Sequence, residues 1–151
     1  MAVAGEIGTE GIVARRVGIV VSTYNANITT RLEEGAIKTL MEGGFAPHEL
    51  IVTKVPGAWE LPLAAKRLLR DEAIRGVVCL GAVIRGETTH DQHINRAVST
   101  ALMQLMLEHG RPVGFGLLTC NNLEQALHRA GGNVGNKGSE TAQAVLQMLA
   151  D

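Results

Sequence analysis

The densest group of residues able to do chemistry is the segment Gly81-Ala82-Val83-Ile84-Arg85-Gly86-Glu87-Thr88-Thr89-His90. An apolar run ends there, and a glycine, two hydroxyls and an imidazole follow before a helical pattern begins. Unpaired N–H groups at the start of a helix bind anions such as phosphate, and histidine transfers protons near neutral pH. Taken alone, the segment is better explained by a helix capped by Thr88 or Thr89 and an ordinary loop histidine. A chemical role for this segment therefore depends on finding other residues in the chain that could act with it.

Two scarce aromatic side chains also follow apolar runs. Aromatic residues make up only 3% of the chain, and Tyr24 and Trp59 could each stack on a flat heterocycle. Asn25 offers an amide to a ring edge or a sugar hydroxyl, or else forms an Asx turn or a helix cap. Glu60 either complements the dipole of the helix that it begins or accepts hydrogen bonds from polyol hydroxyls.

A second dense segment, Arg129-Ala130-Gly131-Gly132-Asn133-Val134-Gly135-Asn136-Lys137-Gly138, places two cations among glycines. It resembles a phosphate cradle, although it lacks the Gly-Lys-Ser/Thr of a Walker A motif. Glycines that end one helix and open the next explain the composition but leave Arg129 and Lys137 unexplained. Gly114-Phe115-Gly116 begins a dinucleotide-binding fingerprint but lacks its third glycine. Neither a Walker A loop nor a dinucleotide-binding site is therefore favoured.

The remaining chemistry-bearing residues give weaker signals. The spacing of His90, Asp91 and His93 matches neither H-E-x-x-H nor a zinc finger, so we predict no metal site. Cys79 and Cys120 form no C-x-x-C pair and are expected to be reduced thiols. A catalytic Cys120 would need a base and an orienting group, and the sequence nominates neither.

Four apolar runs alternate with helical patterns along the chain. Runs that are apolar throughout are typical of strands buried on both faces. The strands are expected at Val17–Ser22, Leu50–Val55, Val77–Ile84 and Val113–Thr119, and the helical stripes at Leu32–Leu40, Leu61–Leu68, Ile94–Leu105 and Thr141–Leu149. This alternation predicts a three-layer α/β/α sandwich on a four-stranded parallel sheet, whose carboxyl ends bring four loops to one rim.

Length and composition favour one domain over residues 1–151. Residues 1–12 form a loose arm that is flexible or adds a strand to a neighbouring subunit. With a net charge of −1, the chain lacks the excess of basic residues that binding to nucleic acid or to a membrane surface requires. The longest apolar run, Val77–Ile84, is far short of the ~20 residues of a membrane helix. Without a signal pattern at the N-terminus, we expect a cytoplasmic protein.

With these segments in order, the chain from about Val17 onward resembles the lumazine synthases, the penultimate enzymes of riboflavin biosynthesis. Six motifs, correctly spaced and ordered, carry the resemblance. They are Tyr24-Asn25, Pro56-Gly57-Ala58-Trp59-Glu60, Ala82-Val83-Ile84-Arg85-Gly86-Glu87-Thr88-Thr89-His90, the Phe115 strand, Glu124-Gln125-Ala126 with Arg129-Ala130-Gly131, and Gly135-Asn136-Lys137-Gly138. The family's fold is flavodoxin-like, in agreement with the predicted sandwich.

The resemblance implies a transferase, 6,7-dimethyl-8-ribityllumazine synthase, that works without a cofactor. It would condense 5-amino-6-ribitylaminouracil with 3,4-dihydroxy-2-butanone 4-phosphate and release phosphate and water. His90 would shuttle protons. The pyrimidine and ribityl subsite would comprise Tyr24, Asn25, Gly57, Ala58, Trp59, Glu60, Val83, Ile84, Phe115 and Lys137. The phosphate subsite would comprise Gly86, Glu87, Thr88, Thr89 and Arg129.

The resemblance also implies self-association, because Phe115, Arg129 and Lys137 would reach the site from a neighbouring chain. Members form pentamers, pairs of pentamers or shells of twelve pentamers, and the short Gly131–Gly138 loop favours a shell. Riboflavin synthase is a candidate partner. The chain departs from the family at Asp91 and Gln92, where an aromatic and then an acidic residue are common, and at Tyr24, where Phe or Trp is usual.

Two other classes of function remain open. The chain could be a flavin-binding or lumazine-binding paralogue without activity, or a scaffold whose main purpose is shell formation. His90, Arg129 and Lys137 favour the enzyme over the binding module. Turnover separates the enzyme from the binding module, and a monomeric state would exclude the scaffold.

Overall fold

A computed structural model describes residues 14–86, 90–132 and 134–150. Its main sheet has four parallel strands in the order β2-β1-β3-β4. The strands are β1 (Arg16–Ser22), β2 (Leu50–Val55), β3 (Ile74–Ile84) and β4 (Val113–Cys120). All four run in one direction, so their carboxyl ends meet at one edge, as the alternation of strands and helices predicts.

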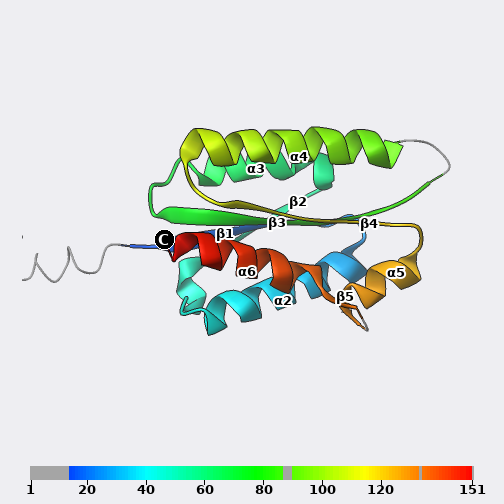
Figure 1. Ribbon diagram of the computed structural model, residues 1–151, viewed down its shortest axis with the longest axis horizontal. Coiled ribbons are helices and arrows are strands. Elements are labelled where there is room, and N and C mark those ends of the chain that lie inside the picture. Colours follow the sequence, from blue (N-terminus) through cyan, green and yellow to red (C-terminus); the bar gives the residue numbers. More distant parts are fainter. Residues whose placement is uncertain (1–13, 87–89, 133, 151) are drawn as a thin grey trace, which may run out of the picture.

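Helices cover both faces of the sheet (Figure 1). One face carries α3 (Leu61–Leu68) and α4 (His90–His109), and the other carries α2 (Ala26–Glu42), α5 (Leu123–His128) and α6 (Lys137–Leu149). The short 3-10 turns η1 (Pro47–Glu49) and η2 (Ala58–Glu60) precede β2 and α3. The predicted three-layer, flavodoxin-like α/β sandwich is confirmed.

The alternation of side chains along β1 explains why the middle of this strand is apolar on both faces. Val17, Ile19 and Val21 pack into the core beneath α2 and α6, whereas Val20 belongs to the core beneath α3 and α4. A strand covered on both faces offers its central positions no contact with water, so residues 17–21 are all apolar.

Three features differ from the sequence-based expectation. β2 and β4 are the edge strands of the sheet. The residues of β2 are half-buried or exposed, so the prediction that this strand is buried on both faces is wrong. For β4 the same prediction is wrong at Phe115, which is exposed. β3 begins three residues before the predicted strand. The glycine-rich segment forms a two-stranded antiparallel hairpin of β5 (Ala130–Gly132) and β6 (Gly135–Asn136), because positive φ angles at Gly131 and Gly135 turn the chain.

Both cysteines lie inside the sandwich as free thiols. Cys79 on the central strand β3 is fully buried, and Cys120 at the end of β4 is 1% exposed. Burial raises the pKa of the Cys79 thiol to about 12, because the interior cannot solvate a thiolate. Cys79 is therefore an inert core residue.

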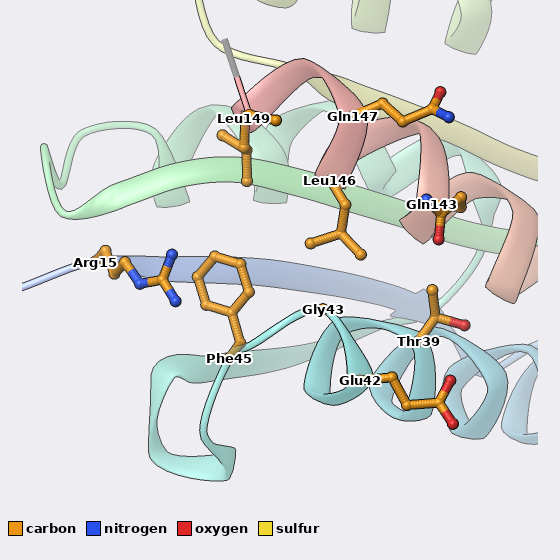
Figure 2. Close-up of a pocket in the computed structure, with 10 residues that line it drawn as sticks. Arg15, Thr39, Glu42, Gly43, Phe45, Gln143, Leu146, Gln147 and Leu149 are labelled. Atoms are coloured by element: carbon orange, nitrogen blue, oxygen red, sulfur yellow. The ribbon is translucent and has the colours of Figure 1, made fainter.

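A cavity of about 510 Å³ lies between the C-terminal turns of α2 and α6 (Figure 2). The Arg15 guanidinium sits 4.2 Å from the centroid of the Phe45 ring at its margin and donates a 3.1 Å hydrogen bond to the Gly44 carbonyl. Since Arg15 immediately precedes β1, this cavity lies at the amino ends of the strands, opposite the predicted rim.

α2 and α6 approach so closely that only glycine fits between them. A Cβ atom built on Gly138, in the first turn of α6, would lie 2.0 Å from the carbonyl oxygen of Leu32 in α2. Because that obstacle is backbone, one helix would have to shift. The close approach fixes the start of α6, and with it Lys137, against the body of the sandwich.

Gly138→Ala is therefore expected to lower the free energy of unfolding by about 3 kcal/mol, a large overpacking effect. Urea denaturation measures it. Gly86→Ala is the matched stability control, because a Cβ there meets nothing within 4 Å. Equal stability of the Gly138 variant and the parent would show that α2 and α6 can separate without cost.

Candidate active site

Backbone hydrogen bonds join the loops that leave the carboxyl edge of the sheet. The Thr23 N–H donates to the Val55 carbonyl at 2.8 Å, which ties the loop after β1 to the end of β2. The Arg85 N–H donates to the Cys120 carbonyl at 2.8 Å, which ties the loop after β3 to the end of β4. The predicted rim is thus a continuous, hydrogen-bonded edge.

A cavity of about 360 Å³ opens at this rim. Three loops and the first turns of α4 contribute to its wall. Its lining residues are Tyr24, Gly57, Ala58, Trp59, Ala82, Val83, Ile84, Gly86, His90, Asp91 and Ile94. The structure therefore brings together most of the predicted ring subsite with one phosphate-loop glycine and the predicted proton shuttle.

Two aromatic rings at this cavity are unusually open to solvent. Tyr24 is 73% exposed and Trp59 is 63% exposed. Large aromatic side chains normally bury most of their surface, so two exposed rings beside one cavity favour a ligand with a flat face. Tyr24 is also tied through its backbone, since its N–H donates to the Pro56 carbonyl at 3.0 Å.

Asn25 holds the first rim loop against the central strand. Its backbone adopts a left-handed conformation with φ of 62°, and its side-chain Nδ2 donates to the Ala82 carbonyl at 2.9 Å. The residue stands at the N-cap of α2, but its side chain does not cap that helix. The contact fixes the side-chain amide of Asn25 against Ala82, which lines the cavity, and the Oδ1 atom of that amide is a hydrogen-bond acceptor.

Glu60 is engaged at the start of its own helix. Its Oε1 atom accepts a 2.9 Å hydrogen bond from the Gly57 N–H, which closes a turn around Ala58 and Trp59. The side chain also lines a neighbouring cavity of about 390 Å³ that includes Lys54. Glu60 therefore shapes the wall that presents Trp59, and a carboxylate retains acceptor capacity for a ligand.

The end of β3 presents backbone and a helix start to the cavity. Val83 and Ile84 are half-buried and pair with Thr119 and Cys120 of β4. Gly86 lies at the cavity wall, and His90 begins α4. The predicted phosphate residues Glu87, Thr88 and Thr89 lie outside the described residues.

Asp91, the second residue of α4, is nearly buried at 6% exposure and lines the same cavity. Its Oδ2 atom lies 3.4 Å from the Nε atom of Arg85. The same guanidinium donates to Asn121 Oδ1 at 3.0 Å, so Arg85 connects the first turn of α4 to the loop after β4.

Arg129 and Lys137 lie in a different cavity, of about 340 Å³, with Thr119, Val134 and Glu140. The hairpin pairs their backbones, since the Lys137 N–H donates to the Arg129 carbonyl at 2.8 Å. Asn136 anchors this arrangement by accepting from the Ser139 N–H and donating to the Arg31 carbonyl, each at 3.1 Å. The sequence did not predict this hairpin, because its glycines are equally well explained as the end of one helix and the start of the next.

Phe115 stands apart from both cavities, on β4 at the edge of the sheet, and is 40% exposed. Within one chain, therefore, the rim cavity holds most of the predicted ring subsite with His90, the second cavity holds Arg129 and Lys137, and Phe115 lies outside both. Sequence reasoning did not single out Glu140, although its spacing of three from Lys137 on a helix places the two on one face.

The described part of the chain offers neither a cluster of metal ligands nor a helix suited to a membrane. Among these residues no group of three or more His, Cys, Asp or Glu side chains could hold a metal ion. No helix within the same ranges has both the length and the apolar character that crossing a bilayer requires.

A parallel α/β sandwich with an aromatic-walled cavity and a histidine at the carboxyl edge of its sheet is the architecture of an enzyme acting on small molecules. The family profile for 6,7-dimethyl-8-ribityllumazine synthase matches residues 14–151. The 6,7-dimethyl-8-ribityllumazine synthase of Rhodopirellula baltica is 50% identical over 143 residues, 94% of this chain and 92% of that protein.

Two further relatives carry the same name. The protein of Desulfovibrio desulfuricans is 40% identical over 147 residues, 97% of this chain and 92% of its own length. That of Pediococcus pentosaceus is 41% identical over 134 residues, 89% and 86% of the two chains. The chain belongs to the 6,7-dimethyl-8-ribityllumazine synthase family, transferases of riboflavin biosynthesis.

Proposed function

We propose that this protein condenses 5-amino-6-ribitylaminouracil with 3,4-dihydroxy-2-butanone 4-phosphate to give 6,7-dimethyl-8-ribityllumazine, releasing phosphate and water. The observation that carries the proposal is the single rim cavity shared by Tyr24, Trp59 and His90. It offers faces for a flat ring and, at its wall, a group able to move protons. Family membership supports the same reaction.

The ring and its ribityl chain occupy the aromatic side of the cavity. Tyr24 stacks on the pyrimidine, with Trp59 on the neighbouring wall, and backbone groups of Val83 and Ile84 meet the ring edge. The ribityl hydroxyls bond to the region formed by Asn25, Gly57, Ala58 and Glu60.

The phosphate of the second substrate occupies the start of α4. Gly86, Glu87, Thr88 and Thr89 surround it, and the positive end of the helix dipole favours its charge. Arg129 supplies a bidentate cation. This places the reacting carbonyl beside the ring amine, within reach of His90.

His90 moves protons through three steps. The primary amine adds to the carbonyl, and water leaves as an imine forms. Elimination of phosphate then leaves an enol that tautomerises to a second carbonyl, and the second amine adds to this carbonyl and closes the ring with loss of water. Each step transfers a proton to or from the reacting atoms, which a histidine serves near neutral pH. Orientation of the two substrates supplies much of the remaining rate, up to ~7 to 11 kcal/mol in favourable cases.

A complete site requires two chains in this proposal. Phe115, Arg129 and Lys137 lie away from the rim cavity of their own chain and are supplied to that of a neighbour. Subunits then assemble in rings of five, and twelve rings close a shell. Electron microscopy measures the assembly; a monomer in solution would contradict both the shared site and a scaffold role.

Mixed assemblies test the sharing directly. His90→Ala and Arg129→Ala chains are refolded together in equal amounts and assayed with the phosphate-bearing substrate well below its KM, where both single variants are slow. The mixture should regain about one quarter of the parent activity, because random rings pair two intact halves at that frequency. Each variant refolded alone is the control. A mixture no more active than the separate variants would place both residues in the same chain's site.

The decisive experiment follows the fluorescence of the lumazine product when purified protein is mixed with both substrates. A reaction without protein is the control, because the condensation proceeds slowly by itself. Acceleration supports the enzyme. Riboflavin binding without acceleration, in an assembled sample, would favour the paralogue that only binds flavins. Gel filtration with riboflavin synthase would test that partner.

The chain contains one tryptophan, Trp59, beside the cavity, so its emission should report ring binding. Titration with riboflavin is expected to quench Trp59 fluorescence. Tyr24→Ala should weaken the affinity about 3- to 10-fold, the size of one aromatic contact, whereas Tyr24→Phe should keep it within about twofold. Unchanged affinity in the alanine variant would remove Tyr24 from the ring subsite.

A further inference from the structure

An ion pair brackets the connection between β3 and α4. Arg85 directly follows β3 and Asp91 is the second residue of α4, and their side chains meet at 3.4 Å. Two further bonds hold Arg85 to the β4 side of the rim, from its guanidinium to Asn121 and from its backbone N–H to Cys120. The start of α4 is thus tied through one arginine to the ends of both neighbouring strands.

The two partners of this ion pair differ in burial. The Arg85 side chain is 55% exposed, whereas that of Asp91 is 6% exposed and lies at the wall of the rim cavity. An exposed arginine has water as an alternative partner, but a buried carboxylate is costly unless it is paired. The ion pair therefore constrains Asp91 more than Arg85, and with Asp91 it constrains the first turn of α4.

His90 immediately precedes Asp91 and lines the same cavity. Whatever fixes Asp91 fixes the backbone from which the imidazole extends.

We propose that Asp91 is a positioning residue: by pairing with Arg85, which Asn121 and Cys120 hold, it fixes the first turn of α4 and therefore the place of His90 in the cavity. The kinetic consequence rests on the proposed function. The structural consequence rests on these contacts alone.

A second tie one turn further along α4 supplies a matched control. Asn95 Nδ2 donates to Thr119 Oγ1 of β4 at 2.7 Å, a neutral contact of the same helix with the same strand. Asn95→Ala loosens the docking of α4 without touching Asp91. The Asn95 variant therefore shows how much activity is lost when α4 is held less firmly in general. Any greater loss in the Asp91 variant is due to the ion pair beside His90.

The test compares the parent with Asp91→Asn, Arg85→Met, the double variant and Asn95→Ala. Asp91→Asn is expected to lower kcat about 10- to 100-fold, because small displacements of a reacting group have effects of this size. The KM for the pyrimidine substrate should stay within about twofold, since the aromatic wall is unchanged. The double variant should be no slower than the slower single variant, because both changes break one contact.

Amide hydrogen exchange gives a readout independent of turnover. The Ile94 N–H bonds to the His90 carbonyl in a regular helix, so its exchange should quicken in Asp91→Asn and remain near the parent rate in Asn95→Ala. Parent-like kcat in Asp91→Asn, an equal loss in Asn95→Ala, or multiplied losses in the double variant would overturn the proposal. If the parent does not accelerate the condensation, the proposed function fails, and Ile94 exchange alone decides the role of Asp91.

Discussion

His90→Ala is expected to lower the kcat of lumazine formation about 100-fold, the lower end of what general acid–base catalysis contributes. The loss is limited because the cavity still orients both substrates. Riboflavin affinity, read from Trp59 emission, should stay within about twofold, since the imidazole moves protons rather than holding the ring. Steady-state kinetics with the background rate subtracted measures the effect.

His93→Ala is the control for this variant. It makes the same chemical change on the same helix, three residues further along, and should leave kcat within about twofold of the parent. If the His90 variant kept the parent rate, the proton transfers would belong to water or to the substrates themselves. Equal losses in both variants would indicate damage to α4 rather than removal of a proton carrier.

Arg129→Ala is expected to raise the KM for the phosphate-bearing substrate about 30-fold, because hydrogen bonds to a charged group contribute about 1.5–3 kcal/mol and the variant removes the guanidinium that would make them. The KM for the pyrimidine should change little, since the proposal assigns Arg129 to the phosphate and not to the ring or its ribityl chain. Initial rates with each substrate varied in turn give both constants.

Two further variants sharpen that measurement. Arg129→Lys keeps the charge but loses the bidentate fork, so it should recover only part of the affinity. Arg96→Ala removes an exposed arginine from α4 and should alter neither KM beyond about twofold. Equal weakening of both substrates by Arg129→Ala would contradict its assignment to the phosphate.

The layers of the fold could be predicted because each central strand leaves a distinctive pattern. β1 and β3 are apolar on both faces, and the stripe from Ile94 to Leu105 follows the helical period. The same reasoning wrongly predicted that β2 is buried on both faces, because an apolar run does not reveal whether a strand lies at the centre or at the edge of a sheet. The hairpin of β5 and β6 is too short for any hydrophobic period, and glycines give equal support to a turn and to a helix end.

The gathering of the ring residues was also predictable, since parallel strands bring their carboxyl ends together. Tyr24, Trp59 and His90 meet for that reason. The contacts that hold them were not predictable. Neither the bond from Asn25 to Ala82 nor the pairing of Arg85 with Asp91 follows from sequence spacing, because each joins separate elements through side-chain rotamers. The catalytic and binding roles themselves stay predictions.

The burial of Cys79 and Cys120 makes this protein a convenient host for site-specific labels. The chain has only these two cysteines, both lie in the core, and a thiol there is slow to react with maleimide reagents. A cysteine introduced in place of the exposed Val134, at the wall of the cavity that Arg129 and Lys137 line, would become the preferred attachment point. A dye at that point, paired with the intrinsic emission of Trp59, could report by energy transfer when two chains come together.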